Sequence, residues 1–258
     1  MTYHSRMTGD VNTLALHCSG ASGRQWRRLQ EHGAAGVGQW HGQHAFSLPD
    51  EAERILSLPE LGDSPLHLVG HSYGGGVALK IAATAPERIA SLSLYEPSAF
   101  HLLHVLGPRG RAAFSDIRRV ARAVADALVS GDYAGGAQAF VDYWNGPGSW
   151  AAMKPELQAD MVRYMPKACL DFRALFEDDT PRAAYRAFRF PVLVMRGEFA
   201  PAPTRVVAEG LGDLIPGAAS ATIAGAGHMG PFTHSEAVNE RILAHIVQAA
   251  SIRELEAA

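Results

Sequence analysis

The sequence has little cysteine, and its charge is nearly balanced. Its 258 residues contain only two cysteines, Cys18 and Cys169, which do not form a pair with the spacing of metal ligands. So few cysteines argue against a disulfide framework and are typical of a reducing compartment. The 23 lysines and arginines face 26 aspartates and glutamates, and no basic stripe is present. We therefore expect no metal site and no nucleic-acid partner.

Long apolar runs are also missing. No stretch approaches the roughly 20 apolar residues that cross a bilayer. Residues 1–16 lack the basic segment, apolar run and small-residue cleavage site of a secretory signal. We therefore expect a cytoplasmic protein without a membrane partner. What is present is ordinary globular composition, with 47% apolar and 19% charged residues, in a chain long enough for one large α/β domain.

Short apolar runs alternate with helical patterns along much of the chain. The runs that predict strands are Leu14–Leu16, Leu66–Val69, the segment SLSLY ending at Tyr95, Val192–Met195, and a segment around Ile223. Strands that alternate with helices form a mainly parallel sheet with helices on both faces. The pattern therefore predicts the α/β class.

The alternation stops between the third and fourth predicted strands. Residues 109–188 show only helical patterns there. An all-helical block inserted between two strands of one sheet is typical of a lid over a site. We therefore predict a helical cap at residues 101–189 and a core formed by residues 1–100 and 190–258.

The segment LHLVGHSYGGG contains a G-x-S-x-G motif at Gly70, Ser72 and Gly74, between a predicted strand and a predicted helix. A serine hydroxyl is a weak nucleophile until a base removes its proton. A sharp strand-to-helix turn exposes that hydroxyl, and the helix N-terminus favours developing negative charge. The motif in this setting predicts Ser72 as a nucleophile.

The general base is expected late in the chain. Where the nucleophile lies on such a strand-to-helix turn, the catalytic residues follow in the order nucleophile, acid, histidine. His228 lies in the glycine-rich segment GAGHMGPFTH, between the last predicted strand and the last helix. Such a loop can carry an imidazole back over the sheet. His234 is the competitor, but its place at a helix start predicts a surface residue. We therefore predict His228 as the general base.

From HCSGASGRQW through LVGHSYGGG and LYEPSAF to PVLVMRGE and GAGHMGP, the chain resembles the α/β-hydrolase family, in particular its esterase-like members with a helical cap. The resemblance implies a mainly parallel α/β-hydrolase sheet. It also implies an oxyanion hole formed by the backbone N–H groups of Ser19 and Tyr73. Cys18 stands where many relatives have glycine. Because Ser19 would act through its backbone, we expect its side chain to matter little.

The resemblance is incomplete at the triad acid. Relatives usually carry an aspartate shortly after the seventh strand, but this chain has GEFAPAPT, with Ala200 at the expected place. Some branches, such as the haloalkane dehalogenases, place the acid after the sixth strand, where this chain has Glu96. The resemblance therefore implies Glu96 as the acid, with Glu198 as the alternative.

The sheet is expected to be smaller than in relatives. Only about a dozen residues precede the first predicted strand, so the two strands that usually begin the fold are expected to be missing. Residues 31–51 are poor in residues that favour strands, so no strand is predicted there. The fold is therefore predicted to be reduced at its N-terminal edge.

Together these features imply hydrolysis of a small carboxylic ester or related acyl compound through an acyl-serine intermediate, with no metal or organic cofactor. The substrate pocket is predicted to use Met229 and large side chains of the cap, namely Tyr143, Trp144, Phe172 and Phe176. The alternative is a non-catalytic ligand-binding protein that keeps the fold and the pocket. No pattern indicates an oligomeric state.

Overall fold

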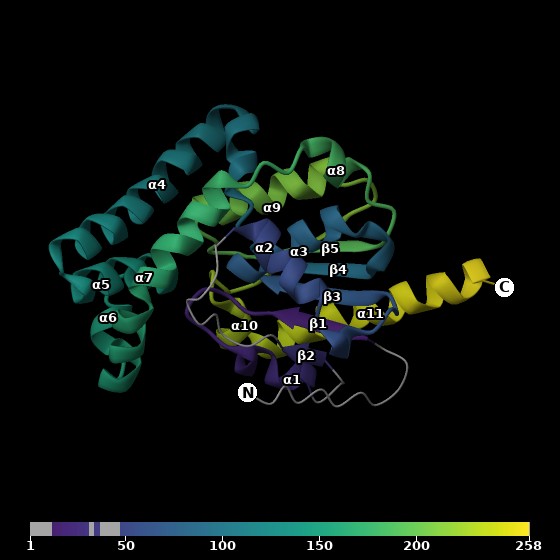
Figure 1. The fold of residues 1–258 in the computed structure, drawn as a ribbon, viewed down its shortest axis with the longest axis horizontal. Coiled ribbons are helices and arrows are strands. Elements are labelled where there is room, and N and C mark those ends of the chain that lie inside the picture. Colours follow the sequence, from purple (N-terminus) through teal and green to yellow (C-terminus); the bar gives the residue numbers. More distant parts are fainter. Residues whose placement is uncertain (1–11, 31–33, 37–46, 258) are drawn as a thin grey trace.

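A single parallel sheet forms the centre of the molecule (Figure 1). The computed structural model describes residues 12–30, 34–36 and 47–257. Six strands lie in the described part, in the order β2-β1-β3-β4-β5-β6, and every neighbouring pair is parallel. The strands are β1 Thr13–Leu16, β2 Ala34–Gly36, β3 Leu66–His71, β4 Ile89–Tyr95, β5 Val192–Gly197 and β6 Ala219–Ile223.

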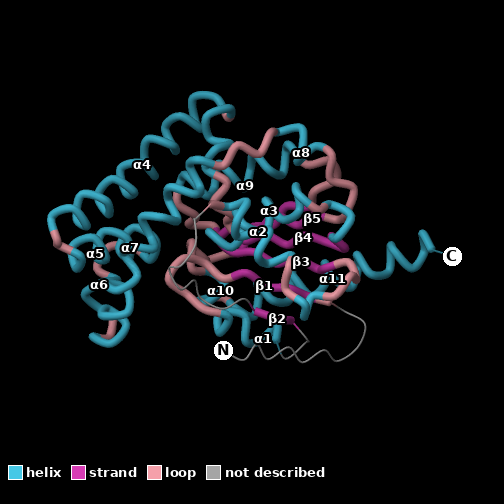
Figure 2. The backbone as a smooth tube through the Cα atoms, viewed as in Figure 1, coloured by secondary structure: helices cyan, strands magenta, loops and turns pink. Residues whose placement is uncertain are grey.

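Helices cover both faces of this sheet, which confirms the predicted α/β class (Figure 2). The central strands β3 and β4 are buried along their whole length, as expected for parallel strands between two helical layers. The helices are η1 Gly23–Trp26, α1 Arg27–Gln30, α2 Leu48–Leu56, η2 Pro59–Leu61, α3 Tyr73–Thr84, η3 Pro86–Arg88, η4 Phe100–Val105, α4 Gly107–Ser130, α5 Tyr133–Asn145, α6 Ser149–Ala152, α7 Pro155–Glu177, α8 Arg182–Arg186, α9 Ala202–Leu214, α10 Gly230–Thr233 and α11 Ser235–Ala257.

Two apolar clusters fill the space between the sheet and the helices, one on each face of the sheet. Alternate residues along β3 show this directly, since Leu68 packs in the cluster with α2, α3 and α9, whereas Val69 packs with Trp26 and the apolar face of α11. Successive side chains of a strand point to opposite faces, so each strand contributes to both clusters. Burying one such leucine or valine contributes about 1.5–3 kcal/mol of hydrophobic free energy.

The elements between β4 and β5 are all helical, as predicted, and run from η4 to α8. Helices α4 to α7 form a group that stands to one side of the sheet (Figure 1). Among the described helices, none has both the length and the apolar character needed to cross a membrane.

The sheet differs from the sequence prediction at one edge. We predicted no strand in residues 31–51, but Ala34–Gly36 forms β2 and pairs with β1. This strand consists of two alanines and a glycine, which carry no β-branched or aromatic signal, so its pairing depends on the neighbouring strand. The expectation that two earlier strands are missing concerns residues 1–11, which lie outside the described part of the chain.

Two buried histidines lie between the sheet and α11. The His67 side chain in β3 hydrogen-bonds through Nδ1 to Ser91 Oγ at 2.8 Å, and His245 Nδ1 lies 2.9 Å from Ser93 Oγ. Burial is the main reason why the pKa of each imidazole falls from 6.5 to about 4. Both side chains are therefore neutral in the folded protein at neutral pH.

These histidines predict a loss of stability in acid. Between pH 6.5 and 4 the unfolded chain binds protons that the folded protein does not, so the free energy of unfolding falls as the pH decreases. Each histidine accounts for about 2–3 kcal/mol of this fall. Chemical denaturation at pH 7, 6, 5 and 4 measures it. His245→Gln keeps a polar side chain but does not titrate, and it is expected to flatten the profile. His104→Gln is the control, because His104 is exposed, and it should leave the dependence of the unfolding free energy on pH unchanged.

Candidate active site

Ser72 occupies the sharp turn between β3 and α3. Its backbone has φ 54° and ψ −120°, a conformation that residues other than glycine rarely adopt. Three backbone hydrogen bonds hold it: Ser72 N–H donates to the Tyr95 carbonyl at 3.1 Å, and the Ser72 carbonyl accepts from Gly76 and Ser98 at 3.0 Å each. The surrounding backbone therefore fixes the strained turn and presents the hydroxyl at the carboxyl edge of the sheet.

The glycines of the motif permit this turn because backbone passes very close to them. A Cβ added at Gly70 would lie 2.6 Å from the Gly74 carbonyl oxygen, and one at Gly74 would lie 2.5 Å from the His17 carbonyl oxygen. Both distances are shorter than real Cβ contacts. The spacing of the motif is therefore a steric requirement of this strand-to-helix turn.

His228 lies against the serine. Its Nε2 is 2.9 Å from Ser72 Oγ, and the imidazole is almost fully buried. The loop before α10 is fixed by Tyr95, whose hydroxyl donates to the Gly227 carbonyl at 2.8 Å. A Cβ at Gly230 would lie only 2.0 Å from that hydroxyl, which explains a glycine at this position. The competing His234 instead contacts Thr233.

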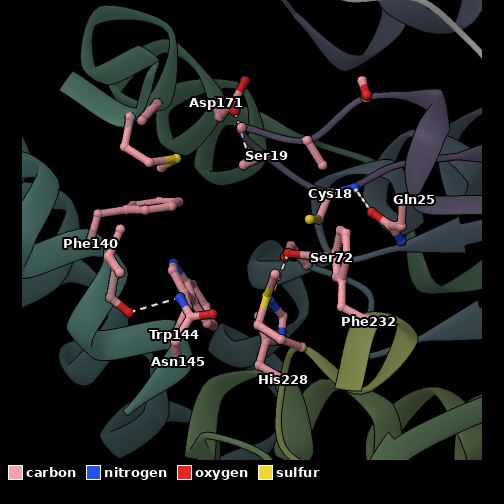
Figure 3. Close-up of a pocket in the computed structure, with 18 of the residues that line it drawn as sticks. Cys18, Ser19, Gln25, Ser72, Phe140, Trp144, Asn145, Asp171, His228 and Phe232 are labelled. Carbon is pink, nitrogen blue, oxygen red and sulfur yellow. Dashed lines mark hydrogen bonds between the residues drawn. The ribbon is translucent and has the colours of Figure 1, made fainter. Parts of the chain in front are cut away.

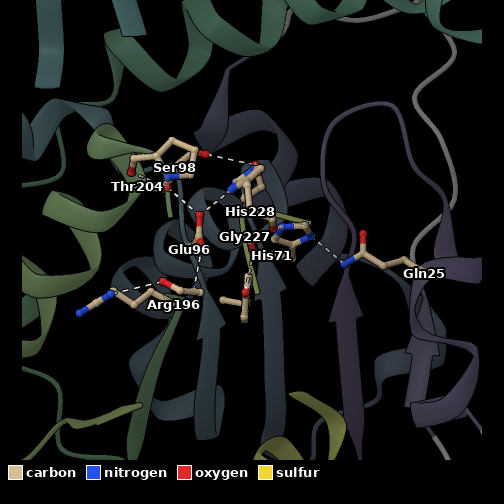
Figure 4. A network of polar contacts seen from close by, with 12 residues as sticks. Gln25, His71, Glu96, Ser98, Arg196, Thr204, Gly227 and His228 are labelled. Atoms are coloured by element: carbon tan, nitrogen blue, oxygen red, sulfur yellow. Dashed lines mark hydrogen bonds and ion pairs between the residues drawn. The ribbon is translucent and has the colours of Figure 1, made fainter. Parts of the chain in front are cut away.

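Glu96 joins the same chain of hydrogen bonds from the end of β4. Its Oε2 lies 2.8 Å from His228 Nδ1, the ring nitrogen that faces away from Ser72 (Figure 4). The fully buried carboxylate also accepts from the Gly197 N–H at 2.9 Å and the Thr204 hydroxyl at 2.7 Å. These donors compensate the cost of burying a charge.

The predicted contact between Glu96 and His228 is thus present, while the alternative acid points elsewhere. Glu198 is exposed, and its carboxylate accepts from the Gly225 N–H at 2.9 Å. Like Ser72, Glu96 has a positive φ, 42°. Two strained residues other than glycine thus stand at the ends of adjacent strands, and both belong to the hydrogen-bonded chain.

A second hydrogen-bonded chain connects the loop after β1 to the histidine loop (Figure 4). The Cys18 N–H donates to Gln25 Oε1 at 3.0 Å, and Gln25 Nε2 lies 3.0 Å from His71 Nδ1. His71 Nε2 in turn lies 2.9 Å from the His228 carbonyl oxygen. Burial holds the pKa of His71 well below its usual value. A neutral His71 that donates to this carbonyl from Nε2 can accept from Gln25 at Nδ1.

This second chain of hydrogen bonds was not predicted from the sequence. His71 directly precedes Ser72, but its link to the His228 carbonyl has no local sequence signal. Gln25 likewise becomes important only through residues far away in the sequence. Cys18 is buried, and burial raises the pKa of its thiol to about 12, which disfavours the reactive thiolate at neutral pH.

One predicted oxyanion residue directly follows Ser72, and the other lines the cavity that contains it. Tyr73 is the first residue of α3, where backbone N–H groups point out of the helix end. Ser19 lies on the loop after β1 and lines the same cavity as Ser72. Its side chain was expected to matter little, but its hydroxyl donates to Asp171 Oδ2 at 2.6 Å.

A cavity of about 720 Å³ opens over Ser72 and His228 (Figure 3). The predicted pocket residues Trp144, Phe172 and Met229 line it. The Trp144 ring lies on the imidazole of His228, with 4.2 Å between ring centroids. The remaining apolar lining from the helical insertion comes mainly from α5 and α7, through Phe140, Val141, Leu157, Met161 and Leu175.

Two predicted pocket residues do not line this cavity. The Tyr143 hydroxyl donates to Asp116 at 2.8 Å, and its ring packs on Trp144. Phe176 packs against Phe100 and Phe114. Both positions therefore stabilise the insertion itself. A helical pattern shows which side chains are apolar, but it does not show whether they face a cavity or a neighbouring helix.

The chain matches a known protein family and a known lipase. The family described as the alpha/beta hydrolase fold matches residues 16–235. The lipase LipV of Mycobacterium tuberculosis is 31% identical over 169 residues, covering 61% of this chain and 59% of that protein. The chain thus matches less than two thirds of the lipase's length.

Solved structures show the same fold. A hydrolase from Pseudomonas aeruginosa PA01 has a TM-score of 0.71 at 23% identity, covering 95% of this chain and 93% of the other. A hydrolase from Oleispira antarctica has a TM-score of 0.72 at 18% identity, covering 93% and 92%. At such low identity the likeness extends to the fold alone.

Proposed function

Because the chain belongs to the alpha/beta hydrolase fold family, we propose that it hydrolyses a small carboxylic ester or related acyl substrate through an acyl-serine intermediate. The family and the lipase relative support a hydrolytic function. The acyl-serine mechanism is proposed from the unbroken series of hydrogen bonds from Ser72 through His228 to Glu96, with donor–acceptor distances of 2.9 Å and 2.8 Å.

In the proposed mechanism the Ser72 hydroxyl attacks the substrate carbonyl carbon while His228 Nε2 accepts its proton. Glu96 holds the proton on Nδ1, which leaves Nε2 free to act as the base, and it stabilises the imidazolium that forms. The imidazolium then protonates the leaving alcohol. A water molecule, deprotonated by the same imidazole, attacks the acyl-serine and releases the acid.

The negative charge that develops on the substrate oxygen requires donors. We assign this role to the backbone N–H groups of Ser19 and Tyr73, supported by the place of Tyr73 at the start of α3 and of Ser19 on the wall of the cavity that contains Ser72. Losing one such donor typically costs about 3–4 kcal/mol of transition-state stabilisation. The helix end at Tyr73 further favours negative charge at this place.

The acyl chain is proposed to bind against the helical insertion. We assign residues 101–189 as a cap, and residues 1–100 and 190–258 as the core that carries the triad. The cavity and its lining by Phe140, Trp144 and Phe172 support an apolar acyl group.

A fluorophosphonate probe tests this proposal, because it reacts with a serine that has both a base and an oxyanion hole. We expect one covalent adduct, located at Ser72 by peptide mass spectrometry and absent from heat-denatured protein. A screen of nitrophenyl esters of increasing acyl length then measures the chain preference. Absence of both the adduct and ester turnover would instead favour a non-catalytic ligand-binding protein.

A further inference from the structure

One polar cluster interrupts the apolar wall of the cavity. Asp171 of α7 is only 2% exposed, and its carboxylate accepts hydrogen bonds from the Ser19 hydroxyl, the Tyr164 hydroxyl and the Lys167 ammonium group. Three of these residues belong to α7, whereas Ser19 belongs to the loop after β1. Figure 3 shows the contact between Ser19 and Asp171 at the edge of the cavity. The cluster therefore joins the helical insertion to the core beside the proposed oxyanion hole.

The carboxylate is arranged to hold protein groups and not a ligand. Oδ2 accepts from the two hydroxyls and Oδ1 accepts from Lys167, so both oxygens have protein partners. A buried carboxylate with a paired cation and two further donors has its charge compensated within the protein. Lys167 Nζ also lies 4.5 Å from the ring centre of Tyr73. The cluster thus contacts both residues assigned to the oxyanion hole.

The loop itself is seated against the same helix. Gly20 has a positive φ of 74°, and a Cβ there would lie 3.2 Å from the Met161 side chain. The same Cβ would lie 3.4 Å from the Tyr164 ring, so a second side chain of α7 packs against Gly20. On its other side, the loop is held by the hydrogen bond from the Cys18 N–H to Gln25. The orientation of the Ser19 peptide therefore depends on α7 as well as on the core.

We propose that Asp171 is a positioning residue that holds the Ser19 loop in its oxyanion-binding geometry, so that packing of α7 on the core completes the oxyanion hole. This inference rests on the function proposed above. It departs from the sequence prediction, in which the Ser19 side chain had no role. The hydroxyl of Ser19 acts by orienting its own backbone N–H, and a small displacement of that donor weakens the hydrogen bond to the developing oxyanion.

Kinetics of paired variants test the proposal. Ser19→Ala and Asp171→Asn should each lower kcat about tenfold or more, with KM within about twofold, because a hydrogen bond to a charged group is lost and its effect falls on the transition state. Ser19→Thr keeps the hydroxyl and should restore most of the activity. The double variant should be no slower than the slower single variant, because both changes break one contact.

A matched control exists elsewhere in the structure. Asp178 is also buried and also pairs with a lysine, Lys80, but it does not line the cavity. Asp178→Asn should lower thermal stability and leave kcat within about twofold. Equal kcat values for Ser19→Ala and the original protein, or effects of the two single changes that multiply in the double variant, would overturn the proposal.

Amide hydrogen exchange gives a readout that needs no turnover. Residues 17–22 should exchange about tenfold faster in Asp171→Asn and in Ser19→Ala, but not in Asp178→Asn. An active wild-type enzyme whose loop exchange is unchanged in both variants would refute the positioning role and keep the hydrolase. A protein without ester turnover whose loop exchange still rises would refute the proposed function while retaining the contact that holds the loop.

Discussion

Ser72→Ala is expected to lower ester turnover by about five orders of magnitude or more, the range reached when the serine of such a triad is removed. The change deletes the attacking oxygen, so the acyl-serine intermediate cannot form. The fold should persist, because the hydroxyl faces the cavity and, within the described part of the chain, hydrogen-bonds only to His228 at 2.9 Å and Ser98 at 3.4 Å. Steady-state hydrolysis of a nitrophenyl ester measures the effect, and circular dichroism checks the fold.

The neighbouring hydroxyl supplies the comparison. Ser98 lies close to Ser72 but is 26 residues away in the sequence and makes no contact with His228 among the described hydrogen bonds. Ser98→Ala is therefore expected to reduce turnover by less than about tenfold. A Ser72→Ala protein with more than a tenth of the original activity would show that another group attacks the ester.

The residues proposed as nucleophile and base could be recognised in the sequence because their signals are local. Gly70, Ser72 and Gly74 lie within five residues between a strand and a helix with clear periodicities, although the backbone that a Cβ at Gly74 would meet belongs to Leu16 and His17. The loop of His228 is recognisable by its glycines and by its position late in the chain. Such features lie within about ten residues of sequence, so they can be recognised without a structure.

Other parts of the site depend on contacts between distant segments. Gln25 acquires its role only where β1 and β3 lie side by side, and Asp171 only where α7 packs on the loop after β1. Strand β2 consists of small residues that form a strand because β1 offers an unpaired edge. Tyr143 and Phe176 were assigned to the pocket for their size, yet tertiary packing directs both elsewhere. Composition and periodicity do not determine these contacts between distant segments.

The second large effect is expected at the acid. Glu96→Gln should lower kcat by a factor of about 10³ or more while the fold is retained, on the order of the loss seen when the acid of a serine triad becomes an amide. The amide is nearly the same size as the carboxylate, so packing changes little. What changes is the number of hydrogen bonds that the side chain can accept.

Glu96 accepts from three donors, the Gly197 N–H at one oxygen and the Thr204 hydroxyl and His228 at the other. Glutamine has only one oxygen. If that oxygen faces Gly197, the amide nitrogen faces His228 and selects the tautomer with the proton on Nε2, which cannot accept the proton of Ser72. If the oxygen faces His228 instead, two N–H groups meet at Gly197 in a buried site, which costs about 1–3 kcal/mol.

Either arrangement also removes the negative charge that stabilises the imidazolium during attack, so the loss should appear in kcat more than in KM. Glu198→Gln is the matched comparison, since it makes the same chemical change at an exposed residue that contacts only the Gly225 N–H among the described hydrogen bonds. It should leave kcat within about twofold. If instead Glu198→Gln caused the large loss and Glu96→Gln did not, the carboxylate that works with His228 during turnover would be Glu198, and reaching it would require the loop between β5 and α9 to rearrange.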